Sequence, residues 1–148
     1  MAIASWTVNY IGIPFVSGGR DTLGCDCYGL VRLVLLEQFQ YKLPLLTGFY
    51  ENANNADETK SLFQEHIPLL AGEKIEKPEP GAVAVIRFRG LPVHVGIFVS
   101  DDTILHVMSG VDSHLVKYTS PVLRGGVEGI YRVDKNYRVH PSILNRKD

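Results

Sequence analysis

The segment from Leu30 to Phe39 is the feature that most limits what this chain can become. Only Arg32, Glu37 and Gln38 interrupt it with polar side chains, and its apolar residues recur at the 3.6-residue period of an α-helix. A helix that is apolar on nearly every side is stable only when other parts of the chain cover it. The sequence therefore predicts one buried helix in the middle of a domain.

Asp26 marks the expected start of this helix. Asp is a favoured N-cap, because its carboxylate accepts hydrogen bonds from the free N–H groups of the first helical turn. Cys27 would then lie in that first turn, directly before the apolar run. Leu43 and Pro44 are expected to end the segment, since proline cannot continue a helix.

After Gly81 the pattern changes to a period of two residues, which is typical of β-strands. Five strands are predicted, over residues 82–88, 93–99, 103–108, 115–118 and 127–133. A short helix over Ser5–Ile11 is also expected. These elements indicate an α+β fold, in which an N-terminal helical part packs on an antiparallel sheet of about five strands.

The remaining segments carry weaker signals. Asp57 is predicted to cap a helix that runs through His66, and residues 74–80 read as a connector with prolines and alternating charges. Residues 141–148 are predicted to form a polar tail. Because 148 residues are enough for one hydrophobic core, we expect a single domain over residues 1–148.

Charge and hydropathy exclude several classes of protein. The chain has 15 Lys and Arg against 16 Asp and Glu, without a basic block, so no nucleic-acid partner is expected. No apolar run is long enough to cross a bilayer, so we expect no membrane insertion. The N-terminus lacks the basic and apolar regions of a secretory signal, which predicts synthesis in the cytoplasm. No cofactor is expected.

Cys27 is the candidate nucleophile. A thiol at the start of a helix lies at the positive end of the helix dipole, which favours the reactive thiolate. The plainer alternative is that a free cysteine is usually a small buried hydrophobe, so the catalytic interpretation needs a base nearby. Only one residue separates Cys27 from Cys25, which would strain a disulfide. We therefore expect two free thiols, with Cys25 inert.

Two histidines are candidates for that base and its partner. His94 and His106 lie on neighbouring predicted strands. If Ser100–Asp102 is a three-residue loop, Val99 pairs with Thr103, and His106 then lies opposite Gly96 on the same sheet face as His94. A two-residue loop would move His106 to the other face. The catalytic interpretation therefore depends on the loop having an odd number of residues.

If the helix lies across the histidine face, the parts of an activated nucleophile come together. His94 would take the thiol proton and return it to the leaving amine, and His106 would orient His94 as the third member of a triad. The backbone N–H of Cys27 would stabilise an oxyanion. A metal site is the weaker alternative, because Cys25, Cys27 and the two histidines match no common zinc spacing.

Four motifs in order carry a resemblance to a known family. They are Tyr10-Ile-Gly-Ile-Pro-Phe-Val-Ser-Gly-Gly19, Gly24-Cys-Asp-Cys-Tyr-Gly-Leu-Val31, Pro80-Gly-Ala-Val-Ala-Val85, and His94-Val-Gly-Ile-Phe-Val99 followed by His106. The chain resembles the NlpC family of papain-like cysteine peptidases, which cut the peptides of bacterial cell walls. The resemblance implies catalysis by Cys27, His94 and His106 on a papain-like fold. It also implies substrate contacts from the following residues: Phe15, Gly18, Gly19, Asp26 and Tyr28.

Three positions depart from the family pattern. Tyr28 replaces the usual serine after the catalytic cysteine, as in the bacteriophage tail-associated branch. Phe15 stands where a tyrosine often contacts substrate, and Ala82 where an acid often follows Pro-Gly. The resemblance thus implies an amide hydrolase of peptidoglycan stem peptides that partners phage tail proteins and is incorporated in a virion tail. A tail-assembly protein with a vestigial site and a thiol acyltransferase are the alternatives.

Overall fold

The computed structural model describes residues 3–43, 73–88, 91–123 and 126–133. In chain order, its elements are η1 (Ser5–Tyr10), β1 (Arg20–Asp21), β2 (Gly24–Cys25), α1 (Cys27–Phe39), β3 (Glu73–Ile75), β4 (Val83–Phe88), β5 (Leu91–Phe98), β6 (Thr103–Met108), β7 (Val111–Lys117), η3 (Pro121–Leu123) and β8 (Val127–Arg132).

Helix α1 begins where the sequence predicts. Asp26 is the N-cap, and its side chain accepts a hydrogen bond of 2.8 Å from the backbone N–H of Gly29. The helix ends at Phe39, and Gln40 follows in the left-handed conformation with φ 58°. Every residue from Cys27 to Leu35 is buried, including Arg32, whose Nε–H donates to the Leu43 carbonyl oxygen at 2.9 Å. The prediction of a buried helix is confirmed.

The main sheet has six strands in the order β3-β8-β4-β5-β6-β7, and each neighbouring pair is antiparallel. The α+β architecture is confirmed, and the structure corrects the count of about five strands. The interpretation of residues 74–80 as a connector is wrong at its start, because β3 pairs with β8 from Glu73 to Ile75. Arg132 of β8 makes ion pairs with Glu73 of β3 and with Glu79, which follows that strand.

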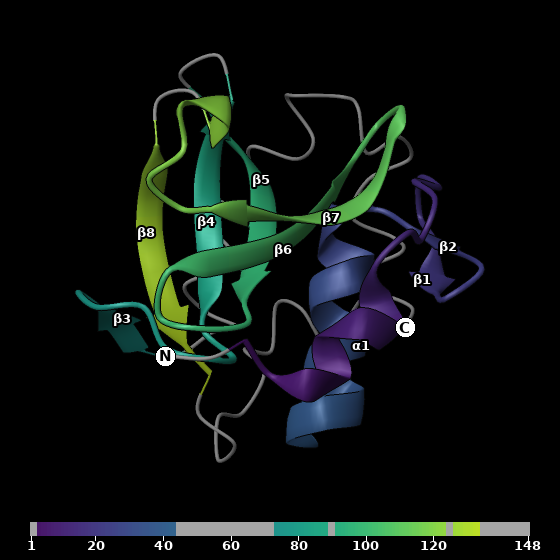
Figure 1. Cartoon of the computed structure of the whole chain (residues 1–148), viewed down its shortest axis with the longest axis horizontal. Helices are drawn as coiled ribbons and strands as arrows, with labels where there is room; N and C mark the ends of the chain where they lie inside the picture. The colour runs from purple at the N-terminus through teal and green to yellow at the C-terminus, as the bar shows by residue number, and fades with distance from the viewer. Residues whose placement is uncertain (1–2, 44–72, 89–90, 124–125, 134–148) are drawn as a thin grey trace, which may run out of the picture.

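The two faces of the sheet carry different clusters. The odd-numbered residues Val95, Ile97, Leu105 and Val107 pack with α1 in one cluster. The even-numbered Phe98 and Ile104 belong to a second cluster, and in Figure 1 strands β6 and β7 cross in front of β4 and β5. The apolar residues of α1 therefore pack with the aliphatic odd-numbered residues of these strands, which provide a large apolar surface for a buried helix.

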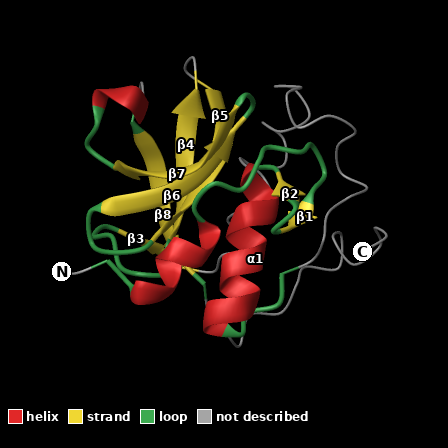
Figure 2. Cartoon of the chain, turned by 45° about the vertical axis from the view of Figure 1, so that its right-hand side comes forward, coloured by secondary structure: helices red, strands yellow, loops and turns green. Residues whose placement is uncertain are grey.

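The short N-terminal helix η1 lies beside α1 (Figure 2). The rings of Trp6 and Phe39 meet edge to face with centroids 5.9 Å apart, and the Tyr10 hydroxyl donates to Glu37 at 2.7 Å. The helix predicted over Ser5–Ile11 is thus present as a 3₁₀ helix. In the described part of the chain, no helix is long and apolar enough to cross a membrane. The helix predicted from Asp57 to His66 and the tail over residues 141–148 lie outside the described residues.

Candidate active site

The register of β5 and β6 brings the two predicted histidines together. Ile97 pairs with Leu105 and Phe98 with Ile104, and the Val99 N–H donates to the Thr103 carbonyl oxygen at 2.9 Å. The connection is therefore the predicted three-residue loop. Gly96 lies on β5, where a Cβ would come within 2.5 Å of the Ile104 Cγ2 and 3.3 Å of the His106 Cβ. The glycine lets these side chains fill the face beside the histidines.

His94 and His106 form a buried pair. Nε2 of His94 lies 2.8 Å from Nδ1 of His106, and the side chains are 8% and 0% exposed. Burial, followed by the neighbouring histidines, lowers the pKa of His94 to about 3. Burial and His114 lower the pKa of His106 to about 4. Both rings are thus neutral at neutral pH, and each can act only as a neutral imidazole.

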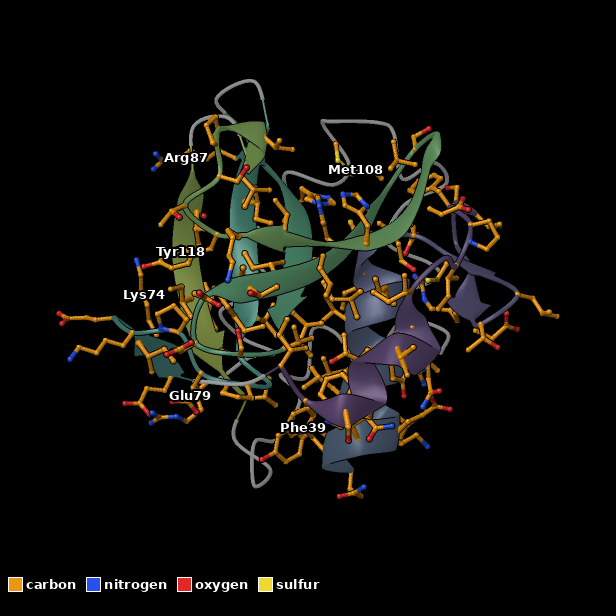
Figure 3. The ribbon with its side chains drawn as sticks, in the orientation of Figure 1. Phe39, Lys74, Glu79, Arg87, Met108 and Tyr118 are labelled. Atoms are coloured by element: carbon orange, nitrogen blue, oxygen red, sulfur yellow. The ribbon has the colours of Figure 1, made fainter. Side chains whose placement is uncertain are left out.

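The Cys27 thiol contacts the backbone of the strand that carries His94. Its hydrogen-bonding partners are the backbone groups of Val95 and Tyr28. Val95 lies on β5 beside His94, so the first residue of α1 meets the sheet at this strand. Figure 3 shows Met108, at the end of β6, on the side of the molecule where α1 begins, and Phe39 at the opposite end of the helix. The thiol therefore contacts the strand that carries His94, at the residue next to His94 in the sequence.

Among the described residues, the Cys27 sulfur makes no hydrogen bond to an imidazole. The structure places the thiol against the backbone of Val95, next in sequence to His94, and joins the imidazoles of His94 and His106 by a hydrogen bond. Catalytic hydrogen bonds are often long in a free enzyme and shorten when substrate binds, so a bond from the thiol to His94 stays a prediction.

Burial sets the protonation state of the thiol. Burial, followed by the adjacent Asp26 carboxylate, raises the pKa of Cys27 to about 12. Hydrogen bonds from the backbone at Val95 and Tyr28 act in the opposite direction but are weaker. The expectation that the helix start favours the thiolate is therefore wrong for the resting protein, because desolvation outweighs the helix dipole. The resting site pairs a neutral thiol with a neutral imidazole, and attack requires a base.

Cys25 is a second free thiol in a different setting. Both cysteines are reduced and buried, as the sequence predicts. Burial and then Asp26 raise the pKa of Cys25 to about 12. Cys25 lies on β2, paired with Arg20 of β1, and its side chain is 0% exposed. The two thiols share the direction of their pKa shift, so only location distinguishes them.

Asp26 holds the loop and the helix start together. One carboxylate oxygen accepts from the Gly18 N–H at 2.9 Å, and the other accepts from the Gly29 N–H and from the Arg20 Nη1 at 2.9 Å. The ion pair is largely buried, with side-chain exposures of 10% for Arg20 and 0% for Asp26. The Asp26 carboxylate thus positions Cys27 through these bonds, and its contact with substrate stays a prediction.

The other predicted substrate-contacting residues surround the same start of α1. Gly29 sits so close to the Gly19 carbonyl oxygen that a Cβ there would overlap it, and Gly18 has φ 76°, a conformation that favours glycine. Tyr28 is fully buried with the Arg20 guanidinium 5.3 Å from its ring centre, while Phe15 is partly buried against the main cluster. The structure brings these residues together around Cys27, and their contacts with substrate stay predictions.

A third histidine lies next to the pair. His114 is directly opposite His106 in the β6–β7 register, with the Nε2 atoms of the two rings 3.1 Å apart. Sequence analysis missed it, because the strand was predicted to begin at Leu115 instead of Val111. The signal was present, since His114 and Val116 alternate with Ser113 and Leu115 in the way that a strand alternates its faces.

The described residues show no group of three or more His, Cys, Asp and Glu arranged to hold a metal ion. Each histidine ring of the cluster instead has a nitrogen facing a neighbouring ring.

Comparison with known proteins identifies the fold. The family described as the NlpC/P60 family matches residues 12–124. Among solved structures, the chain is similar to the NlpC/p60 domain of the peptidoglycan hydrolase SagA, with a TM-score of 0.58 and 20% identity over 87% of this chain and 94% of that one. An NlpC/P60 family protein from Bacillus cereus gives a TM-score of 0.58 and 15% identity over 83% of this chain and 36% of that one.

A third similar structure is an NLP/P60 family protein from Staphylococcus aureus, described as similar to a lipoprotein. It has a TM-score of 0.57 and 20% identity over 90% of this chain and 39% of that one. The chain thus spans nearly all of the SagA domain but well under half of the other two proteins. No curated protein matches this chain in sequence.

Proposed function

The chain belongs to the NlpC/P60 family, and from that premise we propose that it hydrolyses amide bonds in the stem peptides of peptidoglycan, with Cys27 as the nucleophile. Members of the family are cysteine peptidases and hydrolases. The observation that carries the proposal is the buried hydrogen bond between His94 and His106. His94 lies on β5, and the backbone of the next residue on that strand, Val95, contacts the Cys27 thiol. This arrangement supplies a nucleophile, a base and an orienting group from three elements.

The first half of the reaction follows from the protonation states. Since the resting thiol and His94 are both neutral, His94 takes the thiol proton as the sulfur attacks the carbonyl carbon of the substrate. Nε2 of His94 is bonded to His106, so Nδ1 is the nitrogen that takes the proton. His106 holds the ring in place while its charge develops.

The tetrahedral intermediate and its collapse use the start of α1. The backbone N–H of Cys27, at the helix N-terminus, donates to the oxyanion, where the helix dipole also favours negative charge. The proton on His94 passes to the leaving amine, which departs and leaves an acyl group on Cys27. A water molecule, deprotonated by His94, then releases the acyl group and restores the thiol. The bond that we propose for cleavage is the one next to a γ-D-glutamyl residue, as in the family that the chain resembles.

Release of peptides from purified peptidoglycan, identified by mass, tests this proposal. Cys27→Ala is expected to abolish turnover and His94→Ala to cause a similarly deep loss, because the members of a triad act as a unit. His106→Ala removes only the orienting bond, so activity should fall but persist, within the roughly 10²–10⁴-fold contribution of base catalysis. Cys25→Ser serves as the matched control and should keep its activity, since Cys25 lies on β2 away from the histidines.

Circular dichroism of each variant separates loss of folding from loss of chemistry. An active Cys27→Ala would show that the nucleophile is wrongly assigned. If the folded wild type is as inactive as Cys27→Ala on peptidoglycan from several hosts, the alternative of a vestigial, structural site gains support. Transfer of the acyl group to an added amine in place of water would instead favour a thiol acyltransferase.

We further propose that the protein acts as a bacteriophage tail component and binds other tail proteins. Tyr28, which replaces the serine after the nucleophile, supports this role because the same replacement is found in the tail-associated branch of the family. Mass spectrometry of purified virions is expected to detect peptides of this chain. Their absence from virions, with the protein present in cells, would rule out the tail role and leave the hydrolase proposal intact.

A further inference from the structure

His114 is a half-buried neighbour of the catalytic pair that the proposed reaction does not use. It lies on β7, directly across from His106 of β6. The two ring centres are 4.5 Å apart with an interplanar angle of 54°, and the two Nε2 atoms are 3.1 Å apart. Three imidazoles therefore form a continuous chain of hydrogen bonds from His114, through His106, to His94.

His114, at the far end of this row of imidazoles, bonds to a group that can only accept a hydrogen bond. Nδ1 of His114 lies 2.9 Å from the backbone carbonyl oxygen of Asp112. A carbonyl oxygen has no hydrogen to give, so Nδ1 of His114 must carry one. A neutral imidazole has one donor and one acceptor nitrogen. Nε2 of a neutral His114 is therefore an acceptor.

That single assignment determines the other two rings. Because Nε2 of His114 accepts, Nε2 of His106 must donate to it, and Nδ1 of His106 is left as an acceptor. Nε2 of His94 must then donate to Nδ1 of His106. Burial keeps His94 and His106 neutral, so Nδ1 of His94 has no hydrogen. With all three rings neutral, this is the only arrangement that satisfies every bond in the chain.

We propose that His114 is a positioning residue, which acts through His106 to hold His94 in the tautomer whose Nδ1 can accept the proton of the Cys27 thiol. The proposal rests on the proposed function and deepens it. Without an acceptor at position 114, His106 can take either tautomer. In one of them Nδ1 of His94 carries hydrogen and cannot act as a base.

Three substitutions at position 114 separate the possible outcomes. His114→Glu offers only acceptors and should preserve the tautomer of His94. His114→Lys offers only donors and should reverse the tautomers of both His106 and His94. His114→Leu offers neither and should leave a mixture. Because the position is half-buried, it has room for these side chains to reach solvent. Lys117→Gln, an exposed position on the same strand, is the matched control.

The direct measurement is the ¹⁵N spectrum of the histidine rings in protein labelled with ¹⁵N-histidine, since ring nitrogens with and without hydrogen resonate far apart. The expected result is an unprotonated Nδ1 of His94 in wild type, Lys117→Gln and His114→Glu, and a protonated one in His114→Lys. A His94 tautomer that is the same in wild type, His114→Leu and His114→Lys would overturn the proposal.

Kinetics on peptidoglycan fragments provide the second readout. His114→Leu should lower kcat by on the order of tenfold, less than the loss of the base itself, with KM unchanged, and His114→Glu should restore kcat. A His114→Glu as slow as His114→Leu would count against tautomer control. The ¹⁵N result does not require turnover, so an inactive wild type would refute the hydrolase proposal without deciding the role of His114.

Discussion

Replacing His106 with glutamine should make the protein less sensitive to acid. In wild type, burial lowers the pKa of His106 to about 4, whereas a histidine in an unfolded chain titrates near 6.5. As the pH falls below about 6.5, the unfolded state therefore binds a proton that the folded state excludes. The contribution of His106 to the free energy of unfolding is fully present above that pH and is lost as the pH falls towards its pKa in the folded state. The glutamine side chain of the variant cannot take up this proton.

The size of the effect follows from the shift. Each excluded proton costs about 1.4 kcal/mol of unfolding free energy per pH unit. Between pH 7 and pH 5, His106 should lower the free energy of unfolding by about 2 kcal/mol, and by pH 4 the loss should reach roughly 3 kcal/mol. The carboxylates titrate in both proteins, so their contributions largely cancel in the comparison.

Urea unfolding of wild type and His106→Gln at pH 7, 6 and 5 measures this difference. The free energy of unfolding of wild type should fall by about 2 kcal/mol more than that of the variant between pH 7 and pH 5. The absolute stabilities at pH 7 do not matter, because only the change with pH is compared. Parallel pH curves would refute the reasoning, since they would mean that folded His106 titrates like an unfolded histidine.

Two further outcomes follow from the surroundings of Cys27. Alkylation of both thiols should rise with pH, because each has a pKa raised to about 12. Peptide mass mapping should find Cys27 alkylated faster than Cys25, because Cys27 lies at the start of α1 against the strand that carries His94. Equal rates would argue against an activated Cys27. Asp26→Ala should lower the free energy of unfolding, measured in urea, by about 3–5 kcal/mol, because it removes the helix cap and the carboxylate of a buried ion pair. A loss below about 1 kcal/mol would show that this ion pair contributes no more than a surface ion pair.

Local features of the sequence determined most of the elements and one decisive register. The start of α1 follows from Asp26, whose side chain caps the helix wherever the helix packs. The shared face of His94 and His106 follows from the length of the loop over Ser100–Asp102, because side chains in a strand alternate with a period of two. Both are properties of neighbouring residues, so sequence alone could predict them.

Only the tertiary structure decided which side of α1 meets the sheet and what protonation states result. The apolar pattern of α1 has no preferred side, so sequence could not show which residues of the helix pack against the aliphatic odd positions of the strands. The raised pKa of Cys27 depends on how completely neighbouring elements exclude water, and that exclusion outweighs the local effect of the helix start. β3 was missed because it is short and pairs with a strand far away in the sequence, and His114 was missed because its own strand was predicted to begin at Leu115.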